Sequence, residues 1–178
     1  MSRIKISTNE PKIGTLKIAF ATSDMENIDA HFGSAKQFAV YDVSKNSVQT
    51  CEIIKIEEID VHGTISGSFK KISIFMNIFN VHVNRVPYGG KIEKICYHHG
   101  KFVSANLDKA SEENERNEVM IRTDDGRVIW TVQIAGLIAR RIVCWTSEGA
   151  SIGKGERFGL ICFGSRVEVF LPSDSRIV

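Results

Sequence analysis

The stretch GERFGLICFGSRVEVFLP, residues Gly155–Pro172, decides the predicted fold. It holds two apolar, β-branched runs, Gly159–Phe163 and Arg166–Leu171, joined by the dipeptide Gly164-Ser165. Short runs of this composition, bounded by glycine, are typical of strands in sandwiches and barrels. The stretch therefore predicts two neighbouring strands that meet at a glycine-serine junction.

The same pattern extends along most of the chain. Further strands, separated by Gly, Asp-Gly or Pro, are predicted at Leu16–Thr22, Gln37–Val43, Val48–Ile56, Lys71–Met76, Val81–Arg85, Lys91–Tyr97, Glu118–Arg122, Val128–Ile134 and Arg140–Trp145. Helix is predicted only at Ala135–Ala139, which is short, and at the highly charged Leu107–Asn117, which equally suits a solvated loop. We expect a mainly β (α+β) fold: a β-barrel or sandwich-like domain with one or two short helices, preceded by a small β-hairpin segment.

Composition is that of a folded globular protein. The 178 residues are 43% hydrophobic and 25% charged, which suits one domain or one domain with a short extension. The net charge of +2 is too small, and the basic residues too scattered, for a nucleic-acid partner. The most apolar stretch, Ile72–Val83, is too short to span a membrane, and the N-terminus lacks the apolar core of a signal peptide. We expect a cytoplasmic protein.

The four cysteines form no CxxC pair, so reduced thiols are expected rather than a zinc knuckle or a disulfide frame. Composition changes near Thr50–Glu58, where the only domain boundary is expected. The predicted units are residues 1–50 and 51–178.

The Gly164-Ser165 bond is a candidate for self-cleavage, although a Gly-Ser pair is also a common turn. The Ser165 hydroxyl would attack the Gly164 carbonyl carbon and form an ester, and glycine suits that position because it has no Cβ to block the attack. Elimination would then release Gly164 as a carboxyl terminus and leave dehydroalanine, which hydrolyses to a pyruvoyl group and ammonia. No coded side chain carries such a ketone, which can accept electrons from a reacting carbon.

The segment VHVNR contains a candidate proton donor. Period-two alternation sends His82 and Asn84 to the face opposite Val81, Val83 and Arg85. A histidine with a pKa near neutrality suits general acid work. The alternative is a structural histidine, satisfied by hydrogen bonds at a barrel mouth.

Two pairs of polar residues are weaker candidates for binding a substrate. His98 and His99 lie in a predicted turn, where histidines are usually exposed. Arg140 and Arg141 lie in an apolar run, so alternation sends one guanidinium inward. An inward arginine needs an anion, either a structural carboxylate or a substrate carboxylate or phosphate.

Four ordered motifs between about Cys51 and Pro172 resemble the short, microbial type of phosphatidylserine decarboxylase. They are KKISIFMNIFNVHVNRVPYGGKI, YHHGKFVSANLDKASEENERNEV, QIAGLIARRIVCW and GERFGLICFGSRVEVFLP. The resemblance implies a zymogen that cuts itself at Gly164-Ser165 into a large β chain and a short α chain whose pyruvoyl cofactor derives from Ser165. It also implies conversion of phosphatidylserine to phosphatidylethanolamine by a homo-oligomer, peripheral to the inner face of the cell membrane. His82 matches the family histidine thought to reprotonate the product carbon.

Several departures from the family pattern bear on maturation, among them Asn80 in place of the usual Asp and Asn77-Ile78 in place of a usual Ser-Pro. Family members carry an SPADG-like segment before a KIEE-like strand, and its aspartate is thought to assist self-cleavage. Here Lys55–Glu58 reads KIEE, but Thr50 stands where the aspartate is expected. A non-processed, non-catalytic binding module is therefore the alternative to an enzyme.

The segment Lys17–Val43 resembles the start of the domain found in dinitrogenase iron-molybdenum cofactor biosynthesis proteins. Its HFG motif, which begins at His31, is linked to cluster handling in that family. This resemblance implies a third reading, a cluster-handling protein with His31 as a metal ligand. A β-hairpin with an ordinary turn histidine is the alternative.

Overall fold

A computed structural model of the chain describes residues 15–30, 35–44, 46–61, 67–76, 82–105, 110–138, 141–162 and 165–176. Within these residues strands dominate, and the one helix is the four-residue α1 (Ala110–Glu113). The predicted mainly β fold with a short helix is confirmed.

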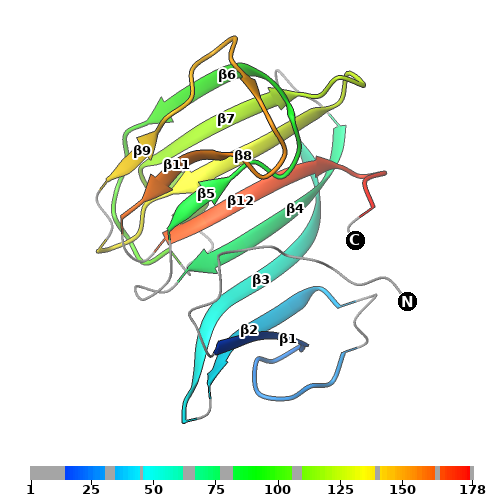
Figure 1. Cartoon of the computed structure of the whole chain (residues 1–178), viewed down its shortest axis with the longest axis vertical. Helices are drawn as coiled ribbons and strands as arrows, with labels where there is room; N and C mark the ends of the chain where they lie inside the picture. Colours follow the sequence, from blue (N-terminus) through cyan, green and yellow to red (C-terminus); the bar gives the residue numbers. More distant parts are fainter. Residues whose placement is uncertain are drawn as a thin grey trace.

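Nine of the described strands form one large, open antiparallel sheet (Figure 1). Its order is β1 (Thr15–Ala21), β2 (Gln37–Ser44), β3 (Val48–Val61), β4 (Gly67–Met76), β12 (Ser165–Pro172), β8 (Val128–Ile134), β7 (Arg116–Arg122), β6 (Gly90–His98) and β10 (Ser151–Ile152). β12 lies in the middle of this sheet and pairs with β4 on one side and β8 on the other. A strand with partners on both sides has its backbone hydrogen bonds satisfied along its length.

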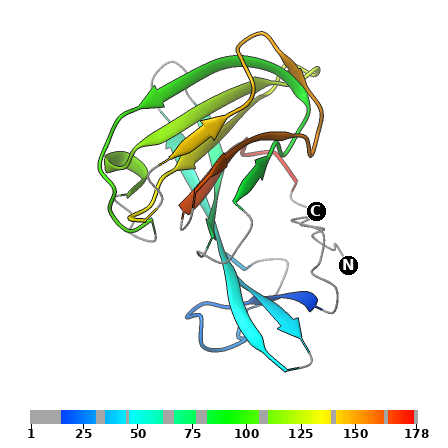
Figure 2. The ribbon, with the colours of Figure 1, turned by 60° about the vertical axis from the view of Figure 1, so that its left-hand side comes forward.

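A second, three-stranded sheet packs against one face of the first, as Figure 2 shows. Its order is β5 (Val83–Arg85), β11 (Arg157–Ile161) and β9 (Ile142–Cys144). Two clusters of buried apolar side chains fill the space between the sheets. One joins Ile92 of β6 and Val119 of β7 to Phe158 of β11, and the other joins Val167 of β12 to Ile161 of β11. We call strands β4 to β12, from both sheets, the sandwich lobe.

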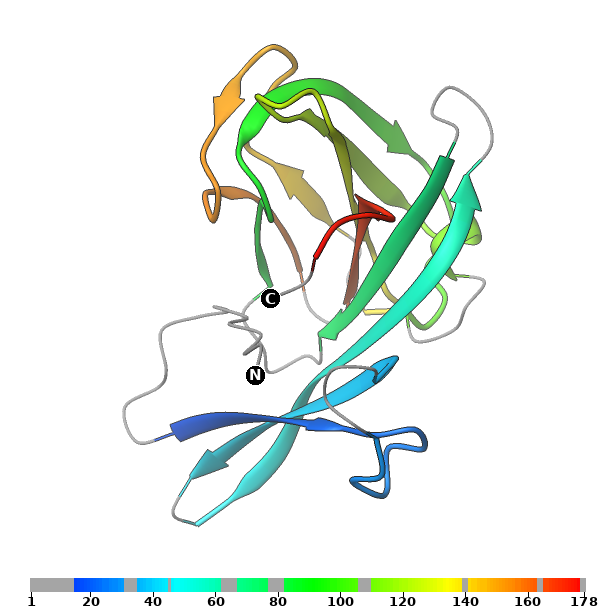
Figure 3. The same cartoon turned by 90° about the vertical axis from the view of Figure 1, so that its right-hand side faces the viewer.

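The hairpin lobe consists of β1, β2 and the first half of β3. Figure 3 shows it set apart from the sandwich lobe, with the long strand β3 running from one to the other. Its small core contains Ala21, Phe38, Val40 and Ile54. β3 pairs with β2 as far as Lys55 and with β4 from Glu52 onward, so the two lobes share one continuous sheet.

Most predicted strands are present within a few residues of their expected ends, and Val128–Ile134 has the expected bounds. The helix prediction for Leu107–Asn117 was wrong at Arg116 and Asn117, which begin β7. This segment has no apolar stripe to pack as a helix, while β6 and β8 offer backbone partners on both sides. Residues 135–138 are also not helical.

Candidate functional site

The start of β12 and the ends of β8 and β11 meet at one edge of the sandwich lobe, toward the left of Figure 1. Arg166, the second residue of β12, pairs with Ile134, the last residue of β8. Ile161, the last residue of β11, donates its N–H to the carbonyl oxygen of His82 at 3.1 Å. We call the edge defined by His82, Ile134, Ile161 and Ser165 the junction edge.

Ser165 is buried at the junction edge, with 2% of its surface exposed. Within the described part of the chain its Oγ has no hydrogen-bond partner. Its side chain shares a face of β12 with Val167 and Val169, which pack in an apolar cluster with Ile161. A buried hydroxyl without a partner is destabilising, and no described group competes for its lone pairs.

His82 is buried too, with 8% of its surface exposed. Asn84 is also buried, whereas Val83 is half-buried and Arg85 is exposed, so the predicted alternation is confirmed at these four positions. The Asn84 Oδ1 accepts a hydrogen bond of 2.7 Å from Gln133 Nε2 on β8. The face that carries His82 and Asn84 is therefore turned toward the large sheet, into the space between the two sheets.

A line of buried amides crosses this interior. Gln133 donates to Asn84 on one sheet, and its Oε1 accepts a hydrogen bond of 2.9 Å from Asn117 Nδ2 on the other. Gly159 allows this approach, because a Cβ there would lie 2.8 Å from Gln133 Nε2 and 2.3 Å from the Val143 carbonyl oxygen. This line of amides was not predicted from the sequence. It could have been found from the polar residues Asn84, Asn117 and Gln133, which occupy inward positions in the strands VHVNR, ERNEV and VIWTVQI.

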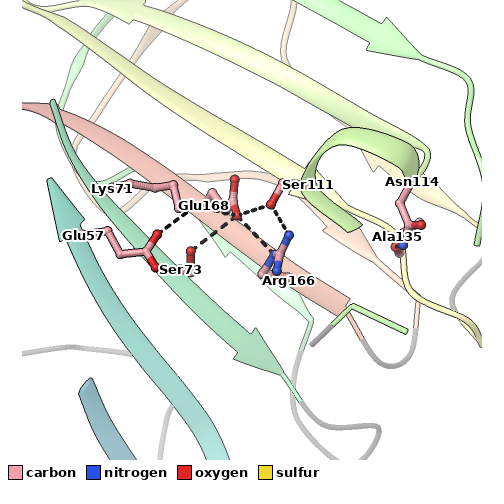
Figure 4. Close-up of polar contacts among 8 residues, drawn as sticks. All are labelled: Glu57, Lys71, Ser73, Ser111, Asn114, Ala135, Arg166 and Glu168. Atoms are coloured by element: carbon pink, nitrogen blue, oxygen red, sulfur yellow. Dashed lines mark hydrogen bonds and ion pairs between the residues drawn. The ribbon is translucent and has the colours of Figure 1, made fainter. Parts of the chain in front are cut away.

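The opposite face of β12 carries an ion-pair network (Figure 4), buried at Arg166 and Glu168 and exposed at Glu57. Its members are Arg166, Glu168, Ser111, Ser73, Lys71 and Glu57. The Arg166 Nε lies 3.2 Å from Glu168 Oε1, which also accepts a hydrogen bond of 2.8 Å from Ser111 Oγ. A second guanidinium nitrogen of Arg166 donates to the Ser111 hydroxyl.

The network ties β12 to β4 and to α1. Lys71 of β4 lies 3.8 Å from Glu168 Oε1, and Ser73 of the same strand donates to that oxygen at 3.4 Å. Arg166 and Glu168 are only 2% and 3% exposed, so their charges depend on one another for compensation. The sequence RVEV already indicates this pair, because Arg166 and Glu168 are two residues apart and such residues share a face of a strand.

His98 lies away from Ser165. His98 of β6 pairs with Arg116 of β7, and Arg116 pairs with Ile134 of β8. Ile134 in turn pairs with Arg166 of β12. Three strand spacings, about 14 Å, therefore separate β6 from β12. In this register His98 shares the face of Arg166 rather than that of Ser165. The structure therefore does not bring His98 and Ser165 together on one face.

Two glutamates lie close to the histidines at the end of β6 and just after it. His98 Nε2 lies 3.2 Å from Glu118 Oε1, and His99, which is exposed, has its Nδ1 3.8 Å from Glu115 Oε2. The Tyr97 hydroxyl donates to Glu115. Burial, and then this hydrogen bond to a carboxylate, raise the pKa of Tyr97 to about 12.

Three of the predicted site residues, Gly164, Arg140 and His31, lie outside the described residues. Arg141 is exposed at the start of β9, so it is not an inward arginine. Among the described residues no group of three or more His, Cys, Asp or Glu side chains is arranged to hold a metal ion. No described helix is long and apolar enough to cross a membrane.

Thr50 lies on β3, where it pairs with Tyr41 and is exposed. The ladder between β3 and β4 ends at Glu52, which pairs with Met76, and Met76 in turn pairs with Ser165. In register, the acidic residue of β3 that lines up with Ser165 is therefore Glu52. This alignment follows from the ladders between β3 and β4 and between β4 and β12, which local sequence patterns do not encode.

The family model for phosphatidylserine decarboxylase matches residues 29–178, a range that includes His82, Gln133 and Ser165. The chain belongs to the phosphatidylserine decarboxylase family. Relatives named phosphatidylserine decarboxylase proenzyme come from Syntrophus aciditrophicus (strain SB), 60% identical over 127 residues, and Ralstonia nicotianae, 58% identical over 106 residues. A third, from Cupriavidus taiwanensis, is 60% identical over 107 residues.

These alignments cover 71%, 60% and 60% of the chain and 60%, 49% and 50% of the respective relatives. The chain thus spans about half to three fifths of the length of these phosphatidylserine decarboxylase relatives. No solved structure matches it. The family match begins at residue 29, and β3 runs across the predicted boundary between residues 50 and 51. That boundary, and the resemblance of Lys17–Val43 to a cofactor biosynthesis domain, stay predictions.

Proposed function

We propose that this chain is a phosphatidylserine decarboxylase that matures by cleaving its own Gly164-Ser165 bond. The observation that carries the proposal is the Ser165 hydroxyl, which is buried and has no hydrogen-bond partner within the described residues. A serine with an ordinary structural role at such a position is expected to have a partner. Family membership and the buried His82 in the same interior support the proposal.

The residues around Ser165 fit a pyruvoyl group. The orphaned hydroxyl lies at the first residue of β12, where the end of a cleaved chain would still be held by its strand partners. A pyruvoyl group there supplies a ketone that takes up the electron pair left when the substrate carboxylate departs as CO2. Ser165 is 2% exposed, so bulk water has little access to this position.

The remaining chemistry falls to side chains of the chain itself. Ser165 Oγ attacks the Gly164 carbonyl carbon, and cleavage frees Gly164 as a carboxylate. His82, which is buried in the same interior, then supplies the proton to the substrate carbon that has lost CO2. The amide of Gln133, held between two neighbours, is fixed in orientation at the interior wall.

The substrate and location follow from the same proposal. Phosphatidylserine is a membrane lipid, so we propose that the enzyme works at the inner face of the cell membrane as a peripheral protein. We also propose a homo-oligomer of cleaved chains. Substrate binding by His98, Arg140 and Arg141 stays a prediction. For His98 the register does not favour it, because His98 lies on the face of the sheet opposite to Ser165.

Intact-mass measurement tests the self-cleavage. The aged protein should yield a large fragment that ends at Gly164 and a small fragment with a blocked first residue, while Ser165→Ala should stay whole. A carbonyl-specific hydrazine should label the small fragment alone. An unbroken wild-type chain of 19.9 kDa after long incubation would leave the non-catalytic alternative in place.

Activity on phosphatidylserine tests the reaction. The cleaved wild type should release CO2 and form phosphatidylethanolamine, and Ser165→Ala should do neither. His82→Ala should still cleave itself but lose decarboxylation, because its proton is needed only after CO2 departs. Loss of both steps in His82→Ala would contradict the role given to this residue.

A further inference from the structure

The loop after β8 exposes two aliphatic side chains. Leu137 and Ile138 are 58% and 65% exposed, although Ala135, two residues before Leu137, is fully buried. Single exposed aliphatic residues are common on protein surfaces and need no explanation. Leu137 and Ile138 are consecutive, and their place next to the junction edge indicates a role for them.

The loop emerges at the junction edge. Ile134, the last residue of β8, pairs with Arg166, the neighbour of Ser165. Leu137 thus lies three residues along the chain from a position that is directly opposite the start of β12. The exposed aliphatic pair and the candidate reactive residue therefore belong to the same end of the sandwich lobe.

A positive charge lies at the same edge. Arg141 is exposed, and its carbonyl oxygen accepts a hydrogen bond of 3.0 Å from the N–H of Cys162. Cys162 follows β11 and precedes Ser165 by three residues. The edge thus combines aliphatic side chains with a guanidinium group, which suits a surface of acyl chains under anionic phosphates.

We propose that Leu137, Ile138 and Arg141 form a membrane-contact edge that docks the enzyme on an anionic phospholipid bilayer. This inference rests on the proposed function and adds how the reactive residue meets a lipid that remains in its membrane. The two aliphatic side chains enter the boundary between head groups and acyl chains, and Arg141 faces lipid phosphates. Docking by this edge turns the end of the lobe that holds Ser165 toward the head groups.

Two observations favour a bilayer over a second copy of the chain. Two aliphatic side chains cover far less than the roughly 800 Å² per partner of a standard protein interface. The adjacent Arg141 is matched by anionic head groups, whereas an arginine meeting its own copy across a two-fold axis faces a like charge.

The hairpin lobe offers a matched control. Leu16, in β1, and Ile28, in the segment after it, are 63% and 69% exposed, so they equal the loop pair in kind and exposure. They belong to the other lobe, away from the junction edge. Leu16→Ser/Ile28→Ser therefore removes the same amount of exposed apolar surface without altering the proposed contact.

The test is sedimentation of the purified protein with vesicles of phosphatidylcholine that contain phosphatidylglycerol, an anionic lipid other than the substrate. Leu137→Ser/Ile138→Ser should weaken vesicle binding by about ten- to a hundredfold, and Arg141→Gln by about fivefold. Wild type should bind more weakly to phosphatidylcholine alone. Unchanged thermal unfolding of each variant confirms that the fold is kept.

Equal binding by wild type and Leu137→Ser/Ile138→Ser, or an equal loss in the hairpin-lobe control, would overturn the proposal. So would a change in oligomeric mass on analytical ultracentrifugation in place of a change in vesicle binding. A separate assay of wild type on dispersed, short-chain phosphatidylserine distinguishes the two proposals. Absence of turnover there refutes the enzyme function, while vesicle binding through Leu137 and Ile138 is measured independently of it.

Discussion

Replacing Ser165 by alanine should stabilise the uncleaved chain. The Ser165 hydroxyl is buried and has no hydrogen-bond partner in the described part of the protein. An unsatisfied buried polar group costs about 1–3 kcal/mol, and alanine removes that group without breaking a hydrogen bond. We therefore expect the free energy of unfolding to rise by about 1–3 kcal/mol, with about 2–4 °C in Tm for each kcal/mol.

The measurement compares urea and thermal unfolding of Ser165→Ala with wild type taken before cleavage, when its mass is that of the whole chain. Ser111→Ala is the matched control, because Ser111 Oγ donates to the Glu168 carboxylate at 2.8 Å. Losing a hydrogen bond to a charged group should lower stability by about 1.5–3 kcal/mol. If Ser165→Ala lowers Tm as Ser111→Ala does, the hydroxyl is hydrogen-bonded in the folded chain and the reasoning is wrong.

Three further predictions concern the ion-pair network of β12, the line of buried amides and Tyr97 of β6. Glu168→Leu should lower the free energy of unfolding by about 3–5 kcal/mol, because it leaves the buried Arg166 charge uncompensated. Arg166→Met should cost less, because Lys71 still lies 3.8 Å from Glu168, and the double variant should lose less than the sum in a double-mutant cycle. Gly159→Ala should cost about 1–3 kcal/mol or more in urea unfolding and slow self-cleavage, because its Cβ would overlap a carbonyl oxygen 2.3 Å away. The Tyr97 pKa is raised to about 12, so its stabilising effect should be complete below pH 10.0 and fade as pH rises toward 12. Phenolate absorbance checks this, and Glu115→Gln should lower the Tyr97 pKa; an unchanged titration would contradict the role of that carboxylate.

Local patterns were enough to predict much of the sandwich lobe. Val128–Ile134 and Arg166–Leu171 are β-branched runs between turn residues, and both are strands in a central part of the sheet. The alternation in VHVNR also correctly predicted that His82 and Asn84 share a face, and the structure shows that this face is the buried one. Each of these predictions depended on neighbours within one strand.

The parts that were missed depend on pairing between distant segments. Gln133 contacts Asn84 and Asn117 only because three separated strands meet in the interior. Arg116 fell in a segment predicted as a helix or a solvated loop from its helix-forming, charged residues, but strand partners on both sides determine its conformation. The alignment of Glu52 with Ser165 depends on ladder register across two strand pairs, which composition does not encode.

The central position of β12 has a consequence for the life of the molecule. A break just before Ser165 would sever the chain without exposing a new sheet edge, because β4 and β8 still flank the strand. The short peptide would then be trapped for as long as the protein stays folded, and a damaged copy could not be exchanged for a fresh one. Activation would be a single irreversible event per chain.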